Sequence, residues 1–257
     1  MDILWTVIFF ILGTEIGSFL NVVIDRLPAE GKSIIKPPSH CDNCQTLLKP
    51  KDLVPIISYL WLHGRCRYCG AHIPLRVPLV ELATGLTLSL LFFGYGWEHE
   101  FWVFSIYGCA LIAIFVIDMN TQLIPNKITY PACVFAIATV PLRDDLNYID
   151  SVSGNALIGG AFGLTLLLAI AVISRGGMGV GDIKLSALMG LAVGFPYIVV
   201  GLFVGVVTGG IVAVALLLMS KKGRKHAIPF GPFLSIGFMA ALLAGDTLWE
   251  WYINPIS

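Results

Sequence analysis

Two aspartates stand beside long apolar runs, where an ionisable side chain is costly and suggests a function. Asp118 directly follows the apolar run 101–117. Asp182 ends a stretch with four glycines in six residues, 176–181, and precedes another apolar run. Glycines allow backbone, including that of a substrate, to approach closely. If the two carboxylates meet, one can hold a proton while the other activates water, which is the chemistry of an aspartate dyad that hydrolyses a peptide bond.

These aspartates could also serve purposes other than a dyad. Asp182 can simply N-cap a helix that begins at Ile183. Asp118 ends a helix, where the helix dipole disfavours an anion, so capping does not account for it. Membrane carboxylates also bind cations and relay protons, which makes a proton- or cation-coupled transporter the main alternative function. A membrane assembly factor without enzymatic activity is a third interpretation.

Four cysteines form two Cys-x-x-Cys pairs, Cys41 with Cys44 and Cys66 with Cys69, and 21 residues separate the pairs. Each pair aims two thiolates at one point, which is typical of a tetrathiolate zinc site. Because four sulfur ligands leave no open position, we expect the zinc to be structural. The alternatives are two disulfides or a redox dithiol. A cytoplasmic location argues against stable disulfides, and no strand context typical of a redox motif is visible.

Two further acidic residues, Glu15 and Glu81, lie inside apolar segments. Each is either a hydrogen-bonded packing residue or part of a second site, and the residues alone do not decide between these two roles.

The composition predicts an all-α polytopic membrane protein with about eight transmembrane helices. Of the 257 residues, 57% are hydrophobic and 12% are charged, with a mean hydropathy of +0.85. A soluble domain of this size does not need so much apolar surface. We expect a first transmembrane helix at 1–25, a cytoplasmic tetra-cysteine zinc domain at 26–77, and a membrane bundle of about seven helices at 78–257. The apolar segments run over 3–24, 78–95, 101–117, 127–142, 155–173, 183–197, 199–219 and 230–248.

The basic residues predict the orientation of these segments. With eight crossings, fifteen of the sixteen Lys and Arg residues lie on one side of the membrane, and only Arg143 lies on the other. By the positive-inside rule the basic side is cytoplasmic. Asp118 and Asp182 then lie at the same, cytoplasmic face, where they could meet. The basic run 221–225 is expected to anchor the orientation and to contact anionic lipid.

Several other short motifs accompany the aspartates and the cysteine pairs. They are Gly17–Pro28, Pro55–Leu60, Arg76–Leu82, Ile124–Pro125, Gly177–Lys184 and Ile228–Leu234. In this order, and over nearly the whole chain, they resemble the type IV prepilin peptidases. This is the family of Gly-x-Gly-Asp membrane aspartyl proteases that act as leader peptidase and N-methyltransferase in bacterial type IV pilus and type II secretion systems.

The resemblance implies that Asp118 and Asp182 are the catalytic pair of a protease of the bacterial inner membrane whose active site faces the cytoplasm. Its substrates would be prepilins or pseudopilins, cut after the glycine that ends a short basic leader. The cysteine segment is associated with the bifunctional members, which methylate the new N-terminal amine with S-adenosylmethionine. Glu81 and the segment 17–28 are the positions expected to serve the methyl donor. The expected partners are the prepilin or pseudopilin substrate and membrane lipid. No nucleic acid partner is expected.

Overall fold

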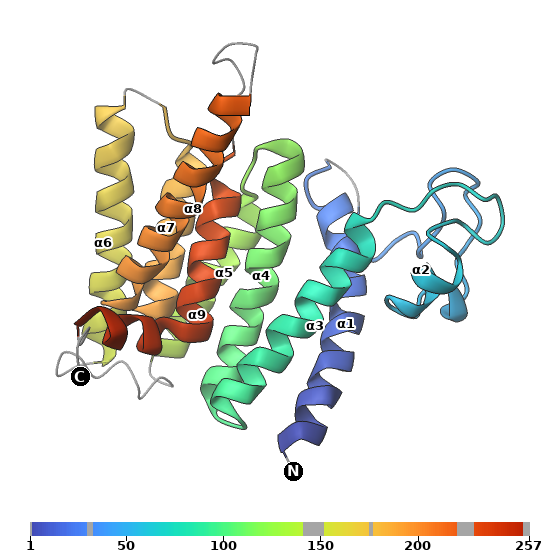
Figure 1. Cartoon of the computed structure of the whole chain (residues 1–257), viewed down its shortest axis with the longest axis horizontal. Coiled ribbons are helices and arrows are strands. Elements are labelled where there is room, and N and C mark those ends of the chain that lie inside the picture. The colour runs from blue at the N-terminus through green and yellow to red at the C-terminus, as the bar shows by residue number, and fades with distance from the viewer. Residues whose placement is uncertain (1, 30–32, 141–151, 175–176, 220–228, 254–257) are drawn as a thin grey trace. The chain divides into compact units, whose positions relative to one another are not determined.

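The structure, a computed structural model, describes residues 2–29, 33–140, 152–174, 177–219 and 229–253 (Figure 1). Most of these residues are helical, and the only β pairing among them is two isolated bridges. The all-α prediction is therefore confirmed for the part of the chain that is described. Arg143 and the basic run 221–225 lie outside the described residues, so the roles expected for them stay predictions.

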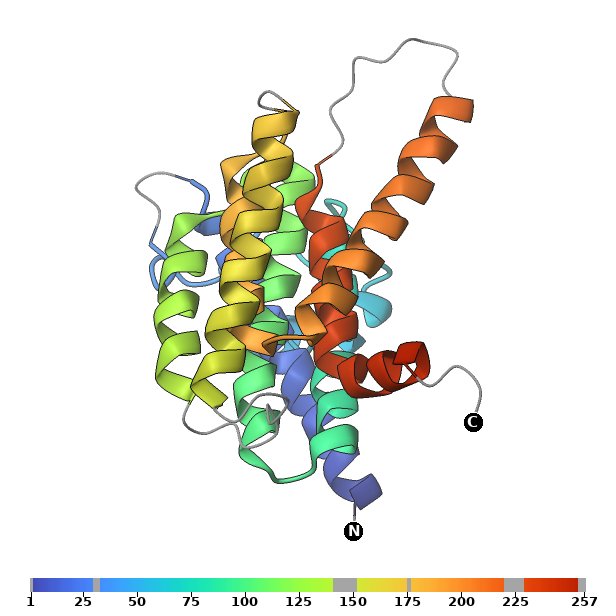
Figure 2. The same cartoon turned by 90° about the vertical axis from the view of Figure 1, so that its left-hand side faces the viewer.

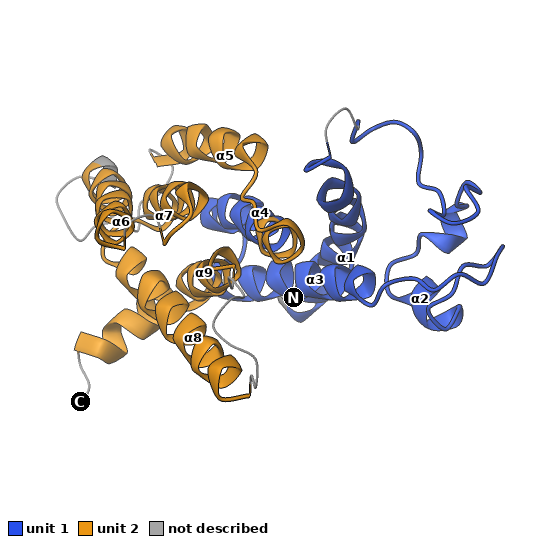
Figure 3. Cartoon of the chain, turned by 90° about the horizontal axis from the view of Figure 1, so that it is seen from above, with its two compact units in different colours: residues 1–113 blue, residues 114–257 orange. Residues whose placement is uncertain are grey.

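The chain divides into two compact units, residues 1–113 and 114–257, coloured separately in Figure 3. The division falls within helix α4 (His99–Thr121). The units are described one at a time. The three-part division expected from the sequence stays a prediction.

Unit 1 is built on two long helices, α1 (Asp2–Arg26) and α3 (Arg76–Tyr95), which lie side by side (Figure 1). Small residues allow this approach, as is common between membrane helices. A Cβ atom on Gly13 would lie 2.7 Å from the Cα of Gly85, and one on Gly17 would lie 2.7 Å from the Cα of Glu81. Larger side chains at Gly13 or Gly17 would therefore force the helices apart.

The segment between α1 and α3 carries both cysteine pairs. It contains two short helical turns, η1 (Pro50–Asp52) and α2 (Ile57–Trp61). Most of it is irregular backbone, held by turns and local hydrogen bonds. A hydrogen bond from the backbone N–H of Ile56 to Glu81 Oε2 joins this segment to α3.

Unit 2 contains the end of α4 and five more helices, and neighbours in the sequence run in opposite directions (Figure 1). Helix α8 packs closely against α9, and a Cβ on Gly201 would meet the Phe238 ring at 2.7 Å. Figure 2 shows α8, in orange, diverging from α9, in red, toward its C-terminal end. Helix α9 bends sharply at Ala244 (Figure 2). The bounds are α5 (Asn126–Thr139), α6 (Val152–Ile173), α7 (Val180–Val193), α8 (Tyr197–Met219) and α9 (Gly231–Ile253).

In the described part of the chain, eight helices match the eight apolar segments in position, and six of them are long and apolar enough to cross a membrane. These six are α1, α3, α4, α6, α8 and α9. Helices α5 and α7 have 14 residues each. At about 1.5 Å per residue they reach roughly 21 Å, less than the hydrocarbon core of about 30 Å. Crossing of the membrane by α5 and α7 stays a prediction.

Candidate functional site

The two aspartates of the expected dyad come together in unit 2. Asp118 lies in the last turn of α4 and is 4% exposed, and Asp182 lies in the first turn of α7 and is 8% exposed. Their carboxyl groups are close enough to interact electrostatically. Two buried carboxyl groups, one from each of two helices, therefore share one site.

Helix α9 supplies the partner that Asp118 lacks on its own helix. The backbone N–H of Gly231, the first residue of α9, donates to the Asp118 carboxyl group. The N-terminal end of a helix carries partial positive charge, which offsets the unfavourable end of α4. A Cβ on Gly231 would lie 2.5 Å from Asp118 Oδ2, so a glycine is needed here. Reasoning from the sequence gave Gly231 no role of its own, although its place between Phe230 and Pro232, just after the basic run, was a signal.

Asp182 is held by its own helix, but not as the N-cap. Helix α7 begins at Val180 with Gly179 as its N-cap, so Asp182 occupies the third helical position. The interpretation in which Asp182 caps a helix starting at Ile183 is therefore wrong. Instead the Asp182 carboxyl group accepts the backbone N–H of Gly179, as the acidic member of a capping box does.

A third residue, Lys184, ties the start of α7 to the start of α5. Its Nζ donates to Asn126 Oδ1 and to the hydroxyl of Tyr130, both at 3.1 Å, and lies 5.1 Å from the Tyr130 ring centroid. The beginnings of α5 and α7 are thus side by side. The amino-acid sequence did not predict this contact.

The four cysteines of the two pairs also come together, in unit 1. Their sulfur atoms all lie within 4.8 Å of one another, and Cys41 Sγ is 3.8 Å from Cys69 Sγ. Tetrahedral zinc with Zn–S bonds of about 2.3 Å separates its sulfurs by about 3.8 Å. The two pairs sit in equivalent turns, closed by the N–H of Gln45 on Cys41 O at 2.8 Å and by that of Gly70 on Cys66 O at 2.9 Å. The cluster is compatible with structural zinc.

The surroundings of the sulfur atoms favour the thiolate form of some of these cysteines and disfavour that of others. The hydroxyl and backbone N–H of Thr46 lower the pKa of Cys44 to about 6. The backbone N–H of Cys44 favours the Cys41 thiolate, but burial and the neighbouring thiols outweigh it and raise the pKa of Cys41 to about 11. Four adjacent thiolates repel one another, and a divalent cation would remove that repulsion. The donor set therefore fits a metal better than it fits four free thiols.

Glu81 lies where α3 meets the cysteine-bearing segment. It is 4% exposed, and its Oε2 accepts the backbone N–H of Ile56 at 2.7 Å. Its carboxyl group also bonds the side chain of Ser18, within the segment 17–28. The structure thus brings Glu81 and Ser18 together, and the expected role of Glu81 and of the segment 17–28 toward a methyl donor stays a prediction. Glu15 is exposed on α1 and interacts electrostatically with Glu81.

Comparison with protein families matches two consecutive domains. Residues 11–95 match the bacterial peptidase A24 N-terminal domain, and residues 105–214 match the type IV leader peptidase family. The first match covers the cysteine pairs and Glu81, and the second covers both aspartates.

Curated proteins similar to the chain over nearly its full length share one name, prepilin leader peptidase/N-methyltransferase. The protein of Bacillus subtilis is 32% identical over 96% of this chain and 97% of its own. The protein of Pseudomonas aeruginosa is 31% identical over 95% of this chain and 92% of its own. The protein of Neisseria gonorrhoeae is 32% identical over 96% of this chain and 94% of its own. No solved structure matches the chain.

Proposed function

The chain belongs to the type IV leader peptidase family, and from this premise we propose that it cleaves prepilins or pseudopilins with the pair Asp118 and Asp182. Its enzyme class, prepilin peptidase with N-methyltransferase activity, follows from the family. The observation that carries the mechanism is the meeting of two buried carboxyl groups at the end of α4 and the start of α7.

In the proposed reaction the pair holds one proton. The ionised carboxylate takes a proton from a water molecule, whose oxygen attacks the glycine carbonyl carbon at the end of the leader. The protonated carboxyl group hydrogen-bonds the carbonyl oxygen as negative charge develops on it. The C–N bond then breaks, and the leaving amine receives a proton from the pair, which returns to its starting state. The two carboxyl groups titrate as a unit, so the mechanism assigns the base to the pair.

We place this chemistry at the cytoplasmic face, and the helix directions in unit 2 support an eight-span arrangement. Helices α5 and α7 begin side by side, through the contact of Lys184 with Asn126. If α6 crosses the membrane, α5 must cross as well, because otherwise α5 and α7 would begin at opposite faces. The hydrogen bond between Gly231 and Asp118 joins the start of α9 to the end of α4. By the same reasoning, if α8 crosses the membrane, α7 must cross as well. Short helices inside a protein bundle can meet this requirement where lipid is locally thinner.

The cysteine cluster is proposed to hold structural zinc through Cys41, Cys44, Cys66 and Cys69. The chain is proposed to take S-adenosylmethionine as methyl donor, with Glu81 among the residues that serve it. When bound, that donor supplies an electrophilic methyl group for the new N-terminal amine. The domains we propose are the helix at 1–25, the zinc segment at 26–77 and the membrane bundle at 78–257.

The test is a peptidase assay on purified protein in detergent with a synthetic prepilin N-terminal peptide, read by mass spectrometry. Asp118→Asn and Asp182→Asn should each lower cleavage after glycine by at least about 10²- to 10⁴-fold, the range for losing an acid–base group. Asp246→Asn, the same change at an exposed aspartate of α9, should cleave like wild type. Retained cleavage by either dyad variant would refute the assignment.

A further inference from the structure

The short helix α2 of unit 1 and the residue pair before it present an exposed apolar face. Val54, Ile57, Leu60 and Trp61 are exposed, the last three by 63%, 66% and 76%. Their spacing, i, i+3, i+6 and i+7, places these four side chains on one side of a helical turn, which we call the outer face. An exposed apolar face is expected on a helix that crosses a membrane. Helix α2 has only five residues and lies in the segment that carries the cysteines, so its outer face needs another explanation.

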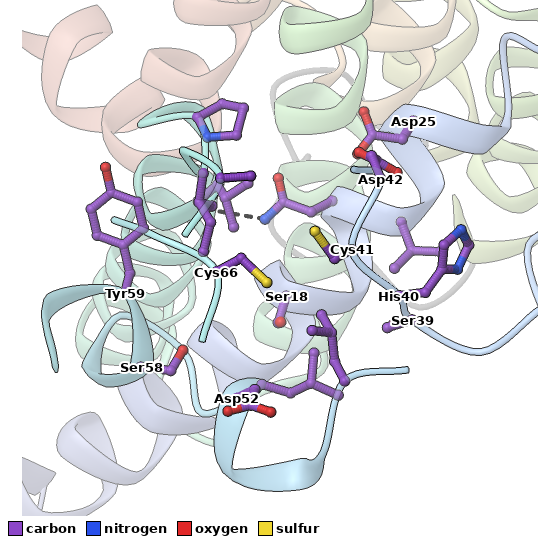
Figure 4. Close-up of a pocket in the computed structure, with 18 of the residues that line it drawn as sticks. Ser18, Asp25, Ser39, His40, Cys41, Asp42, Asp52, Ser58, Tyr59 and Cys66 are labelled. Atoms are coloured by element: carbon purple, nitrogen blue, oxygen red, sulfur yellow. Dashed lines mark hydrogen bonds between the residues drawn. The ribbon is translucent and has the colours of Figure 1, made fainter. Parts of the chain in front are cut away.

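The opposite side of α2 is turned toward the rest of unit 1. Ser58, Tyr59 and Leu62 line a cavity of about 1030 Å³ between α1, α3 and the cysteine-bearing segment, and Figure 4 shows Ser58 and Tyr59 in its wall. None of the four outer-face residues lines this cavity. The turn is therefore two-sided, and its apolar side is the one that faces away from the protein.

A hydrogen bond to α3 sets the level of this turn. The backbone N–H of Ile56 donates to Glu81 Oε2 at 2.7 Å. Glu81 lies five residues beyond Arg76, the first residue of α3, which corresponds to about 7.5 Å along the helix axis. Arg76 pairs with Asp25, near the end of α1, at 2.8 Å. Helix α2 is therefore held beside the first turns of a helix long and apolar enough to cross a membrane, inside the level of these charges.

The figures show the same placement within unit 1. In Figure 1 helix α2 lies beside the α1–α3 pair, and in Figure 3, seen from above, it lies to the side of these helices and not over their ends. This is the position that lipid surrounds when α1 and α3 cross a membrane.

The backbone of the turn suits an apolar environment, because its hydrogen bonds are largely internal. The N–H of Ser58 donates to the oxygen of Val54, and that of Leu62 donates to the oxygen of Ser58, both at 3.0 Å. The N–H of Ile56 is satisfied by Glu81. Irregular backbone at membrane depth is tolerated only where its polar groups have such partners.

Basic side chains border the outer face on both sides in the sequence. Lys51 precedes it and Arg65 follows it, both are exposed, and no ion pair among the described residues involves either. The single carboxylate between them, that of Asp52, is already paired with Arg67. Apolar side chains that include tryptophan, bordered by basic residues, are typical of segments that lie in the interface of a membrane containing anionic lipid.

We propose that α2 is an interfacial anchor, whose outer face inserts into the lipid leaflet at which α3 begins, while Lys51 and Arg65 contact anionic phospholipid headgroups. In the proposed topology this is the cytoplasmic leaflet. Lipid is the occupant because the outer face lies at the level of Leu79 and Leu82, which are exposed on α3 on either side of Glu81. The cysteine-bearing segment is thereby held at the membrane surface through α2 as well as through its two connections to α1 and α3.

The first test is photocrosslinking of the full chain in nanodiscs of phosphatidylethanolamine and phosphatidylglycerol. The photoreactive residue p-benzoylphenylalanine replaces Leu60 or, as the matched control, Leu47, a leucine of the same segment that is 59% exposed and lies outside the outer face. Mass spectrometry should find phospholipid adducts as the main product at position 60 and as a minor product at position 47. Adducts of position 60 with a second copy of the chain or with unit 2 would overturn the proposal, because the outer face would then be a protein interface. Equal lipid labelling at the two positions would overturn it as well.

The second test is the rate of trypsin cleavage at Lys51 and Arg65 in the same nanodiscs. Leu60→Ser should raise this rate about tenfold, since removing one buried leucine from an apolar environment changes an equilibrium by at least about that factor. Leu47→Ser should be cleaved like wild type, and zinc content and prepilin cleavage report whether each variant is folded. Wild type should also be cleaved faster in nanodiscs of phosphatidylcholine alone, which lack anionic headgroups. Equal rates for folded Leu60→Ser and wild type would refute the anchor, and an unchanged rate without anionic lipid would refute the role of Lys51 and Arg65.

Discussion

The geometry of the proposed aspartate dyad depends on the absence of a side chain at Gly231. Its N–H reaches the Asp118 carboxyl group, and a Cβ there would lie 2.5 Å from Asp118 Oδ2. Gly231→Ala should therefore displace the carboxyl group and lower prepilin cleavage by about 10²-fold or more, since small misplacements in catalytic geometry are costly. The measurement is kcat/KM with the prepilin peptide.

Gly210→Ala is the matched control for this change. A Cβ on Gly210 would meet nothing within 4 Å, so the same substitution adds a methyl group in open space. The variant should cleave normally. Equal activity of the two glycine variants would show that the close contact with Asp118 does not matter for catalysis.

Asp52 stabilises the cysteine-bearing segment through its charge. It accepts a hydrogen bond from Arg67 Nε at 2.6 Å and one from the Tyr68 hydroxyl at 2.9 Å. Burial opposes its ionisation, but these donors outweigh that effect and lower the pKa of Asp52. Asp52→Asn should destabilise the segment by about 0.2–1 kcal/mol, the range for partly exposed ion pairs, and increase its cleavage by trypsin at pH 7.

The effect of Asp52 should depend on pH with a definite sign. Because its pKa is lower in the folded state, the stabilisation is complete above the unfolded value of about 3.9 and disappears as pH falls through the folded value. The difference between wild type and Asp52→Asn should therefore be full at pH 7 and vanish in acid. Asp42→Asn, at an exposed carboxylate of the same segment, should show neither effect.

At the scale of elements, the zinc segment and the aspartate pair are separate. The four cysteines lie in unit 1 and the two aspartates in unit 2. Cys66→Ser should release zinc and loosen residues 41–69, and methylation should fall by much more than prepilin cleavage. Metal content by mass spectrometry and the two product masses measure these effects in one preparation.

Cys133→Ser is the control for the loss of a thiol, because Cys133 lies in α5 of unit 2 and is not one of the four cysteines of the cluster. It should keep zinc and both activities. Equal loss of cleavage and methylation in Cys66→Ser would contradict the independence of the two elements.

At the scale of the whole molecule, the membrane crossing of the short helices α5 and α7 decides the topology. Alkaline phosphatase is active only when exported, so fusions report the side of each truncation point. Fusions after residues 140 and 194 should be active, and a fusion after residue 121 inactive, if α5 and α7 cross as proposed. An inactive fusion after residue 140 would contradict the eight-span topology and the shared face of the two aspartates.

Much of this protein could be predicted from sequence because it depends on local chemistry. The positions and lengths of the apolar runs predicted where the helices lie, to within a few residues at most ends. The spacing of the cysteine pairs predicted the cluster, since a Cys-x-x-Cys turn orients its own two sulfurs. The residue types at positions 118 and 182 predicted which side chains could form a dyad, but treating Asp182 as a local N-cap misplaced the start of α7 by three residues.

The tertiary structure alone decided which groups support those side chains. The donor to Asp118 is the backbone of Gly231, and the anchor of α7 is Asn126 on α5. Asn21 on α1 donates to the backbone oxygen of Val77 on α3 only because these two helices pack closely through glycines. Every residue except proline has a backbone N–H group, so the sequence does not indicate which of these groups will meet a given side chain. Their direction is set by packing between segments far apart in the chain, and this is why only the fold reveals them.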